Sequence, residues 1–181
     1  MIRTSISILA FVASTSVGFA ECASPNATFL TCTFSEARQY VDVCVKGDDV
    51  TYTFGFVGAP PDLQLSVPVV GADFVPWPGV GSSIYESMYF TNGDITYEVR
   101  GGVSRVVTSE DGDTEAEMQL KKWGEINVFA HRDDPEQEKI LATLLCDVGT
   151  SSYIYGGSIY DAKIAAGQCW DFYERSWGSC N

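Results

Sequence analysis

Basic residues, histidine and long apolar runs are all scarce in this 181-residue chain. It has 11 lysines and arginines against 24 acidic residues, and its net charge is −13 at pH 7. Such a charge repels the phosphates of nucleic acids and anionic membrane surfaces, so we expect neither as a partner. It attracts cationic molecules, which makes a cationic protein the expected partner. The alternative is that the excess acid only keeps the protein soluble.

The chain contains one histidine, His131, and this limits its chemistry. A zinc site needs several histidine or cysteine ligands, and no Gly-x-Ser-x-Gly turn is present to support a Ser-His-Asp relay. We therefore expect no metal, no cofactor and no catalytic residue. A pair of acidic residues facing each other across a cleft is the one enzymatic alternative that the composition allows.

No apolar run approaches the ~20 residues that span a bilayer, so we expect no membrane insertion. Near the N-terminus, Arg3 precedes a short apolar run from Ile6 to Val12, and small residues lead to Ala20. This pattern is typical of a secretory signal peptide over residues 1–20. It predicts a soluble mature protein in the periplasm or the secretion medium.

Alternation of apolar and polar residues recurs after the predicted signal peptide, with turn residues roughly every eight to twelve positions. This predicts a mainly β fold, an antiparallel barrel or sandwich, as one domain over residues 21–150. The predicted strands are 28–34, 40–46, 50–56, 63–70, 84–91, 94–100, 103–108, 116–122, 125–131 and 140–146.

Asn92-Gly93 predicts a two-residue hairpin turn. That turn would set Glu86 opposite Val99 and send Glu98 to the other face of the sheet. The two acids should therefore not converge, and no feature of the sequence marks any acid as buried.

Residues 151–181 are predicted to form a helical, aromatic, disulfide-tied extension that packs on the same domain. Ser158 is the expected helix cap, and the helix is expected over Ile159–Ala166. The tail that follows carries too much aromatic area to remain in solvent. Its large side chains are Trp170, Phe172, Tyr173 and Trp177.

All six cysteines follow the predicted signal peptide, and an even count in an exported chain favours three disulfides. If Val41, Val43 and Val45 face the core, Cys44 faces away and must be covered, either by the N-terminal arm with Cys22 or by the C-terminal tail. Cys32 should point inward and meet Cys146. The preferred set is Cys22–Cys44, Cys32–Cys146 and Cys169–Cys180.

A loop over residues 74–83 is the leading candidate for a presented surface, because it holds Trp77 between two prolines and rigid loops with large side chains commonly carry recognition. The alternative is that Trp77 folds back and closes one end of the fold.

Four motifs carry a resemblance: residues 29–34, 43–55, 76–81 and 167–171. They are similar to segments of small exported proteins of Gram-negative bacteria for which no activity is known. The resemblance covers most of the chain after the predicted signal peptide. It implies a periplasmic location and no particular activity.

A looser resemblance is to the periplasmic inhibitors of C-type lysozyme, small β-barrels in which an early cysteine is bridged to a late one. Cys32 and Cys146 match those two positions. The segment Gly81–Tyr85 is similar to the loop with which that family enters the enzyme cleft, although the glycine after the serine is missing here. The resemblance implies roles in binding for Ser83 and Tyr85.

Together these features predict an exported, non-catalytic protein that binds a cationic protein, with inhibition of a lysozyme-like hydrolase as the specific version. The expected binding residues are Trp77, Ser83 and Tyr85. The alternative is a carbohydrate or envelope-glycan binding module that uses the aromatics of the C-terminal tail as stacking platforms. Those aromatics are Trp170, Tyr173 and Trp177.

Overall fold

The computed structural model describes residues 22–24, 26–108, 117–132, 134 and 138–180. The predicted signal peptide lies outside these residues. The described chain forms two five-stranded antiparallel sheets, followed by one helix and a C-terminal hairpin. The expected mainly β fold is confirmed, in its sandwich form rather than as a closed barrel.

The two sheets have different strand orders. The first sheet has the order β10-β1-β2-β3-β4, and the second runs in sequence order from β5 to β9. A 3₁₀ turn, η1, connects them. The first sheet comprises β1 (Ala27–Phe34), β2 (Gln39–Lys46), β3 (Asp49–Phe56), β4 (Pro61–Pro68) and β10 (Ser152–Tyr153), η1 is Val69–Gly71, and the second sheet comprises β5 (Asp73–Val75), β6 (Ser83–Asn92), β7 (Ile95–Thr108), β8 (Glu117–Ala130) and β9 (Lys139–Leu145).

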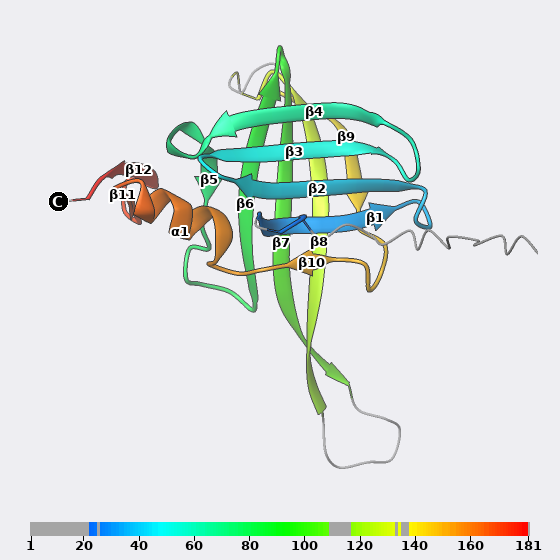
Figure 1. The fold of residues 1–181 in the computed structure, drawn as a ribbon. Coiled ribbons are helices and arrows are strands. Elements are labelled where there is room, and N and C mark those ends of the chain that lie inside the picture. Colours follow the sequence, from blue (N-terminus) through cyan, green and yellow to red (C-terminus); the bar gives the residue numbers. More distant parts are fainter. Residues whose placement is uncertain (1–21, 25, 109–116, 133, 135–137, 181) are drawn as a thin grey trace, which may run out of the picture.

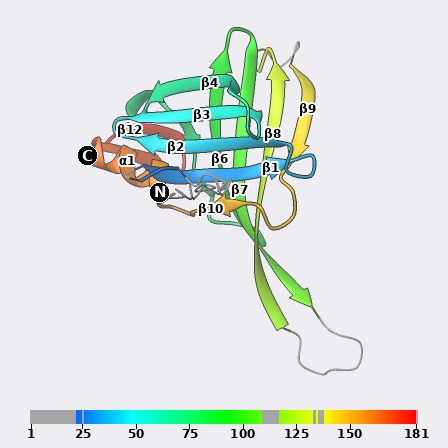
Figure 2. The ribbon, with the colours of Figure 1, turned by 45° about the vertical axis from the view of Figure 1, so that its right-hand side comes forward.

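The strands of the two sheets cross each other, as Figures 1 and 2 show. This is the crossed rather than the aligned class of sheet packing. The core lies between the sheets. Val41 and Val43 of β2 are fully buried, as the alternation predicts, and Phe29 of β1 packs edge-on against Phe74 of β5 with ring centroids 5.9 Å apart.

Two predicted breaks between strands are wrong. Residues 94–108 were expected to form two strands and residues 116–131 another two, but β7 and β8 are continuous strands of 14 residues each. Gly101 and Gly124 lie in the gaps between the predicted strands, at positions where neighbouring side chains leave no room for a Cβ. A Cβ on Gly101 would lie 2.3 Å from the Tyr153 ring, and one on Gly124 would lie 2.7 Å from Cys146 Sγ.

The predicted β6–β7 turn is displaced by one residue. Asn92 pairs with Ile95, so Gly93 and Asp94 make the turn, and Glu86 lies opposite Gly101 instead of Val99. The two-residue change in register leaves the faces unaltered. Glu86 and Glu98 still lie on opposite faces of the sheet, as expected.

The C-terminal segment contains α1 (Ser158–Ala165) and the hairpin of β11 (Gln168–Asp171) and β12 (Ser176–Ser179). Ser158 is not the cap: Gly157 occupies that position, and the buried Ser158 hydroxyl has no hydrogen-bond partner among the described residues. The segment also supplies β10, which pairs with β1. It therefore contributes to the first sheet as well as packing beside the sandwich (Figure 1).

The disulfides are Cys22–Cys44, Cys32–Cys146 and Cys169–Cys180, the three pairs preferred from the sequence. Cys44 is covered by the N-terminal arm, which settles the alternative left open by strand alternation. Three disulfides indicate an oxidising compartment. Within the described residues, no helix is long and apolar enough to cross a membrane.

Candidate functional site

Polar and aromatic side chains gather on the outer face of the second sheet. They come from alternate positions of three neighbouring strands, whose other positions face the core. Strand pairing sets Tyr89, Glu98 and Asn127 in one row across the sheet, and Tyr85, Gly102 and Trp123 in another. We call this surface the outer face: Tyr85, Ser87, Tyr89, Glu98, Arg100, Trp123, Glu125 and Asn127.

Glu98 is the acceptor at the centre of the outer face, and its side chain is 12% exposed. Ser87 Oγ and Tyr89 OH donate to its Oε1 at 3.1 and 2.8 Å, and Asn127 Nδ2 donates to its Oε2 at 3.1 Å. Burial, followed by the hydrogen bond to Glu98, raises the pKa of Tyr89 to about 12. Tyr89 therefore remains a protonated donor to Glu98 throughout the neutral range.

Arg100 lies between two aromatic rings next to this network. Its Nη1 donates to Glu125 Oε1 at 2.7 Å, while its Cζ lies 4.7 Å from the ring centroid of Tyr85 and 5.9 Å from that of Trp123. Gly102 separates the two rings along the row, and a Cβ there would lie 2.4 Å from the Trp123 ring. The absence of a side chain at Gly102 therefore lets Trp123 lie against the strand backbone.

At the β5 edge a second arginine, Arg132, also contacts both a tyrosine ring and a carboxylate. Arg132 Cζ lies 3.7 Å from the ring centroid of Tyr89, and its Nη1 donates to Asp73 Oδ2 at 2.6 Å. Such pairings of arginine with tyrosine and a carboxylate stiffen the outer face before any ligand arrives.

The structure brings two of the three predicted binding residues to one strand. Ser83 and Tyr85 lie on the same side of β6, and Ser83 Oγ lies 2.8 Å from Ser104 Oγ. Trp77 is half-buried in the β5–β6 loop, where its Nε1 donates to the Val80 carbonyl at 3.1 Å.

Trp77 also contacts Tyr155 edge-on, with ring centroids 6.2 Å apart. It is therefore the anchor of the β5–β6 loop. The residue that this loop presents is Val80, which is 70% exposed.

The tail aromatics do not form a flat platform. Trp177 is half-buried, its Nε1 donates to the Phe74 carbonyl at 2.7 Å, and its ring is inclined by 58° to that of Trp170. Tyr173 is 92% exposed. The coplanar, solvent-facing arrangement that the tail would need for stacking on sugars is absent among these rings.

Lys163 of α1 is buried beneath the tail. Its Nζ lies 5.0 Å from the Trp177 ring centroid and donates to Gln168 Oε1 at 3.2 Å. Burial lowers its pKa from the usual value. The lysine thus links the helix to the terminal hairpin.

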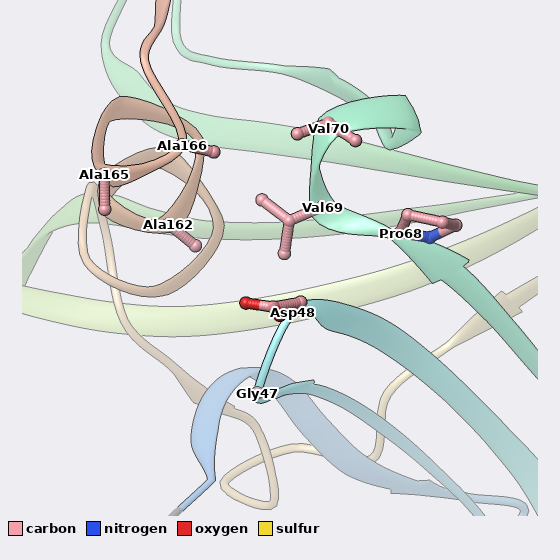
Figure 3. A pocket seen from close by; sticks show the side chains of 8 residues that line it. All are labelled: Gly47, Asp48, Pro68, Val69, Val70, Ala162, Ala165 and Ala166. Carbon is pink, nitrogen blue, oxygen red and sulfur yellow. The ribbon is translucent and has the colours of Figure 1, made fainter.

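A groove of about 440 Å³ separates α1 from η1 (Figure 3). Small apolar side chains such as Val69 and Ala162 line it, and Asp48 at the β2–β3 turn is its charged lining residue. A ligand site normally combines apolar walls with several convergent polar groups. The groove offers little to orient a ligand.

One buried acid was not predicted from the sequence. Glu86 is 2% exposed, contrary to the expectation that no acid is marked as buried. Tyr153 OH and the Gly156 N–H donate to its Oε2 at 2.7 and 3.2 Å. Burial raises its pKa, more than these hydrogen bonds lower it. The signal was present: Glu86 shares its alternation with the core residues Met88 and Phe90.

Among the described residues, no three His, Cys, Asp or Glu side chains come together as metal ligands. His131 is exposed, at a turn position with a φ of 53°. The sequence also has two short acidic segments, residues 110–115 and 133–138. The first lies outside the described residues, as does most of the second.

Comparisons with protein-family models, with curated proteins and with solved structures found no match for this chain.

Proposed function

We propose that this protein is an exported, non-catalytic binding protein of the periplasm or secretion medium that recognises a cationic protein, specifically a lysozyme-like hydrolase. The observation that carries the proposal is the net charge of −13 combined with the placement of the basic residues. Arg100 and Arg132 are held by carboxylates, and Lys163 is 1% exposed. The other basic residues are outnumbered by the 24 acidic residues, so the field of the protein attracts cations.

The β5–β6 loop supports the same proposal. The loop exposes Val80 and is held in place by Trp77, which hydrogen-bonds to the loop backbone and contacts the Tyr155 ring. A loop held in one conformation loses little entropy on binding. Long-range attraction brings the partner in, and the loop supplies the contact.

The test is inhibition and binding of C-type lysozyme by the protein at low and high salt. We expect inhibition at micromolar protein that weakens as salt screens the charges. Succinylated lysozyme, in which the fold is kept and the positive charge removed, should not bind. Absence of inhibition and of binding at low salt would remove the proposal.

One loop variant and one tail variant add a matched comparison. Trp77→Ala releases the loop anchor and should weaken binding about tenfold or more, the range of a truncated interface residue. Tyr173→Ala removes an aromatic that is 92% exposed on the tail and should leave binding unchanged. Equal effects of the two variants would exclude the loop as the contact.

A second candidate function is favoured by the outer face. Trp123 lies against the backbone at Gly102 beside Tyr85, with hydrogen-bonding groups such as Glu125 in the same cluster. Aromatic rings flanked by carboxylates and amides suit a glycan, which offers both an apolar ring face and hydroxyl groups. The glycan alternative thus moves from the tail to this sheet.

Fluorescence titration with soluble peptidoglycan fragments tests this second candidate. Trp123→Ala should abolish a binding response, and Trp170→Ala, which changes a tail ring instead, should preserve it. A response lost equally in both variants, or no response in the unaltered protein, would rule out the outer face as a glycan site.

A further inference from the structure

The β7–β8 hairpin extends beyond its neighbours as a two-stranded arm. β7 and β8 pair along their whole length to Thr108 and Glu117, whereas β6 pairs only as far as Ser104 and β9 only as far as Glu125. We call residues 105–108 and 117–120, which pair only with each other, the arm. Figures 1 and 2 both show it projecting away from the sandwich.

The arm exposes apolar side chains and open backbone. Met118 and Leu120 of β8 are 63% and 67% exposed, and no strand among the described residues pairs with the outer edge of β8 along this stretch. A two-stranded ribbon is only marginally stable in water by itself, and an open edge is a template for another strand. This edge therefore suits a strand partner.

The sequence of that edge is complementary to itself. It reads Glu117-Met118-Gln119-Leu120-Lys121. In an antiparallel register centred on Gln119, a second copy places Leu120 opposite Met118 and Lys121 opposite Glu117. Directly opposed apolar pairs and opposite charges are the cross-strand pairs that stabilise a sheet.

We propose that the arm is a homodimerisation element in which the open β8 edges of two copies pair antiparallel about Gln119. This inference goes beyond the proposed function and does not depend on it. The occupant is a second copy because the apolar and the charged pairs are both satisfied by the same short sequence.

The β9 edge of the same sheet is less suitable. It carries Ile140 and Leu145, which are 61% and 66% exposed, but its ladder with β8 is interrupted by a bulge between Val128 and Phe129. Bulges protect strand edges against pairing. Pairing through β9 would also set two bodies of net charge −13 side by side, whereas arm pairing joins them only through the projecting hairpins (Figures 1 and 2).

Sedimentation velocity over a concentration series tests the proposal on the protein after removal of residues 1–20. The interface is small, so we expect a reversible dimer with a dissociation constant in the micromolar range. Leu120→Glu should abolish the dimer. Leu145→Glu, an equally exposed leucine on β9, should not.

A charge exchange tests the register. Lys121→Glu places like charges opposite each other at two symmetric positions and should weaken the dimer about tenfold. Adding Glu117→Lys to it restores opposite charges and should recover dimerisation to within about threefold of the original. Far-UV circular dichroism checks that each variant is folded.

Three results would overturn the proposal. One is a monomer at every concentration up to about 1 mM. Another is loss of the dimer in Leu145→Glu but not in Leu120→Glu. The third is a folded double variant that remains as weak as Lys121→Glu alone.

Discussion

Glu86 is a carboxylic acid enclosed between the two sheets, where Tyr153 and the backbone of Gly156 are its hydrogen-bond donors. Its position links β6 of the second sheet to β10 of the first. Burial raises the pKa of an acid, because the protein interior solvates the carboxylate ion less well than water does. The residue thus ties the sheets together while making the fold sensitive to pH.

Glu86→Gln should make the protein more stable at pH 7. Because burial raises the pKa of Glu86, the proton on this acid stabilises the folded state. This stabilisation is complete at a pH below the usual pKa of a glutamate, and it is lost as the pH rises through the raised pKa of Glu86. Glutamine keeps an acceptor for Tyr153 and carries no charge. Thermal melting should show a higher Tm for the variant at pH 7 and a smaller difference at about pH 4.

Tyr153→Phe is the companion to that variant. It removes a donor from the Glu86 carboxylate and should lower the Tm more at pH 7 than at about pH 4. A Glu86→Gln protein that is less stable than the original at pH 7 would mean that the carboxylate's hydrogen bonds outweigh its desolvation.

Gly101→Ala should destabilise the protein by about 1–3 kcal/mol or more, the usual cost of overpacking a core. Its Cβ would lie 2.3 Å from the ring of Tyr153, which is 1% exposed and cannot move aside freely. Gly178→Ala on β12 is the control, because no atom of the described residues lies within 4 Å of its added Cβ. Urea unfolding that gives both variants the same stability would contradict close packing at Gly101.

At the scale of elements, alternation was enough to predict most strands of the two sheets and the faces on which Cys44 and Cys32 lie, whereas the partner of Cys44 stayed open. Cys44 had to face away from Val43, and Cys32 had to face inward, whatever the topology. The short strands β5, β10, β11 and β12 were not predicted, because two to four residues carry too little alternation to read. The long strands β7 and β8 were each predicted as two shorter strands, with gaps at Gly101 and Gly124. These glycines lie within continuous strands and pack against side chains from distant parts of the chain, which no local pattern reveals.

The candidate site was harder to predict than the fold. Tyr85 was singled out from a loop resemblance, yet its neighbours Arg100 and Trp123 come from two other strands. Alternation places each of them on a face but does not say which strands are adjacent or in what register. The clustering of the outer face follows from the β6–β7–β8 pairing, which no local pattern contains.

The three disulfides should contribute unequally to stability. Cys32–Cys146 joins residues separated by 114 positions, and Cys169–Cys180 joins residues separated by 11. In the chain-entropy model a loop of ~100 residues is worth about 4.7 kcal/mol and one of ~15 residues about 3 kcal/mol. Removing Cys32 and Cys146 should therefore cost more in urea unfolding than removing Cys169 and Cys180.

Loss of the Cys169–Cys180 disulfide should also destabilise the C-terminal hairpin locally. Both its cysteines are exposed, and the β11–β12 hairpin lies beside the sandwich rather than within it. Hydrogen exchange should accelerate in residues 168–180 while the sheets remain protected. Faster exchange throughout β1–β4 in this variant would show that the tail is required by the sandwich itself.

At the scale of the whole molecule, one electrostatic field has two opposite consequences. The net charge of −13 favours encounter with a cationic partner, and it also makes the compact fold repel itself. Salt screens both effects. Added salt should therefore weaken partner binding and strengthen the isolated fold over the same range of concentration.

The isolated protein should gain about 2–4 °C in Tm between ~10 mM and ~0.3 M NaCl at pH 7, which corresponds to roughly 1 kcal/mol of relieved repulsion. At the sequence pI of about 4.2 the net charge vanishes, so the gain should disappear there. Differential scanning calorimetry at the two pH values measures both. A Tm that falls with salt at pH 7 would show that attractive ion pairs such as Arg100–Glu125 and Arg132–Asp73 outweigh the repulsion between acidic residues. The net negative charge could then not be the source of a salt-sensitive encounter with a cationic partner.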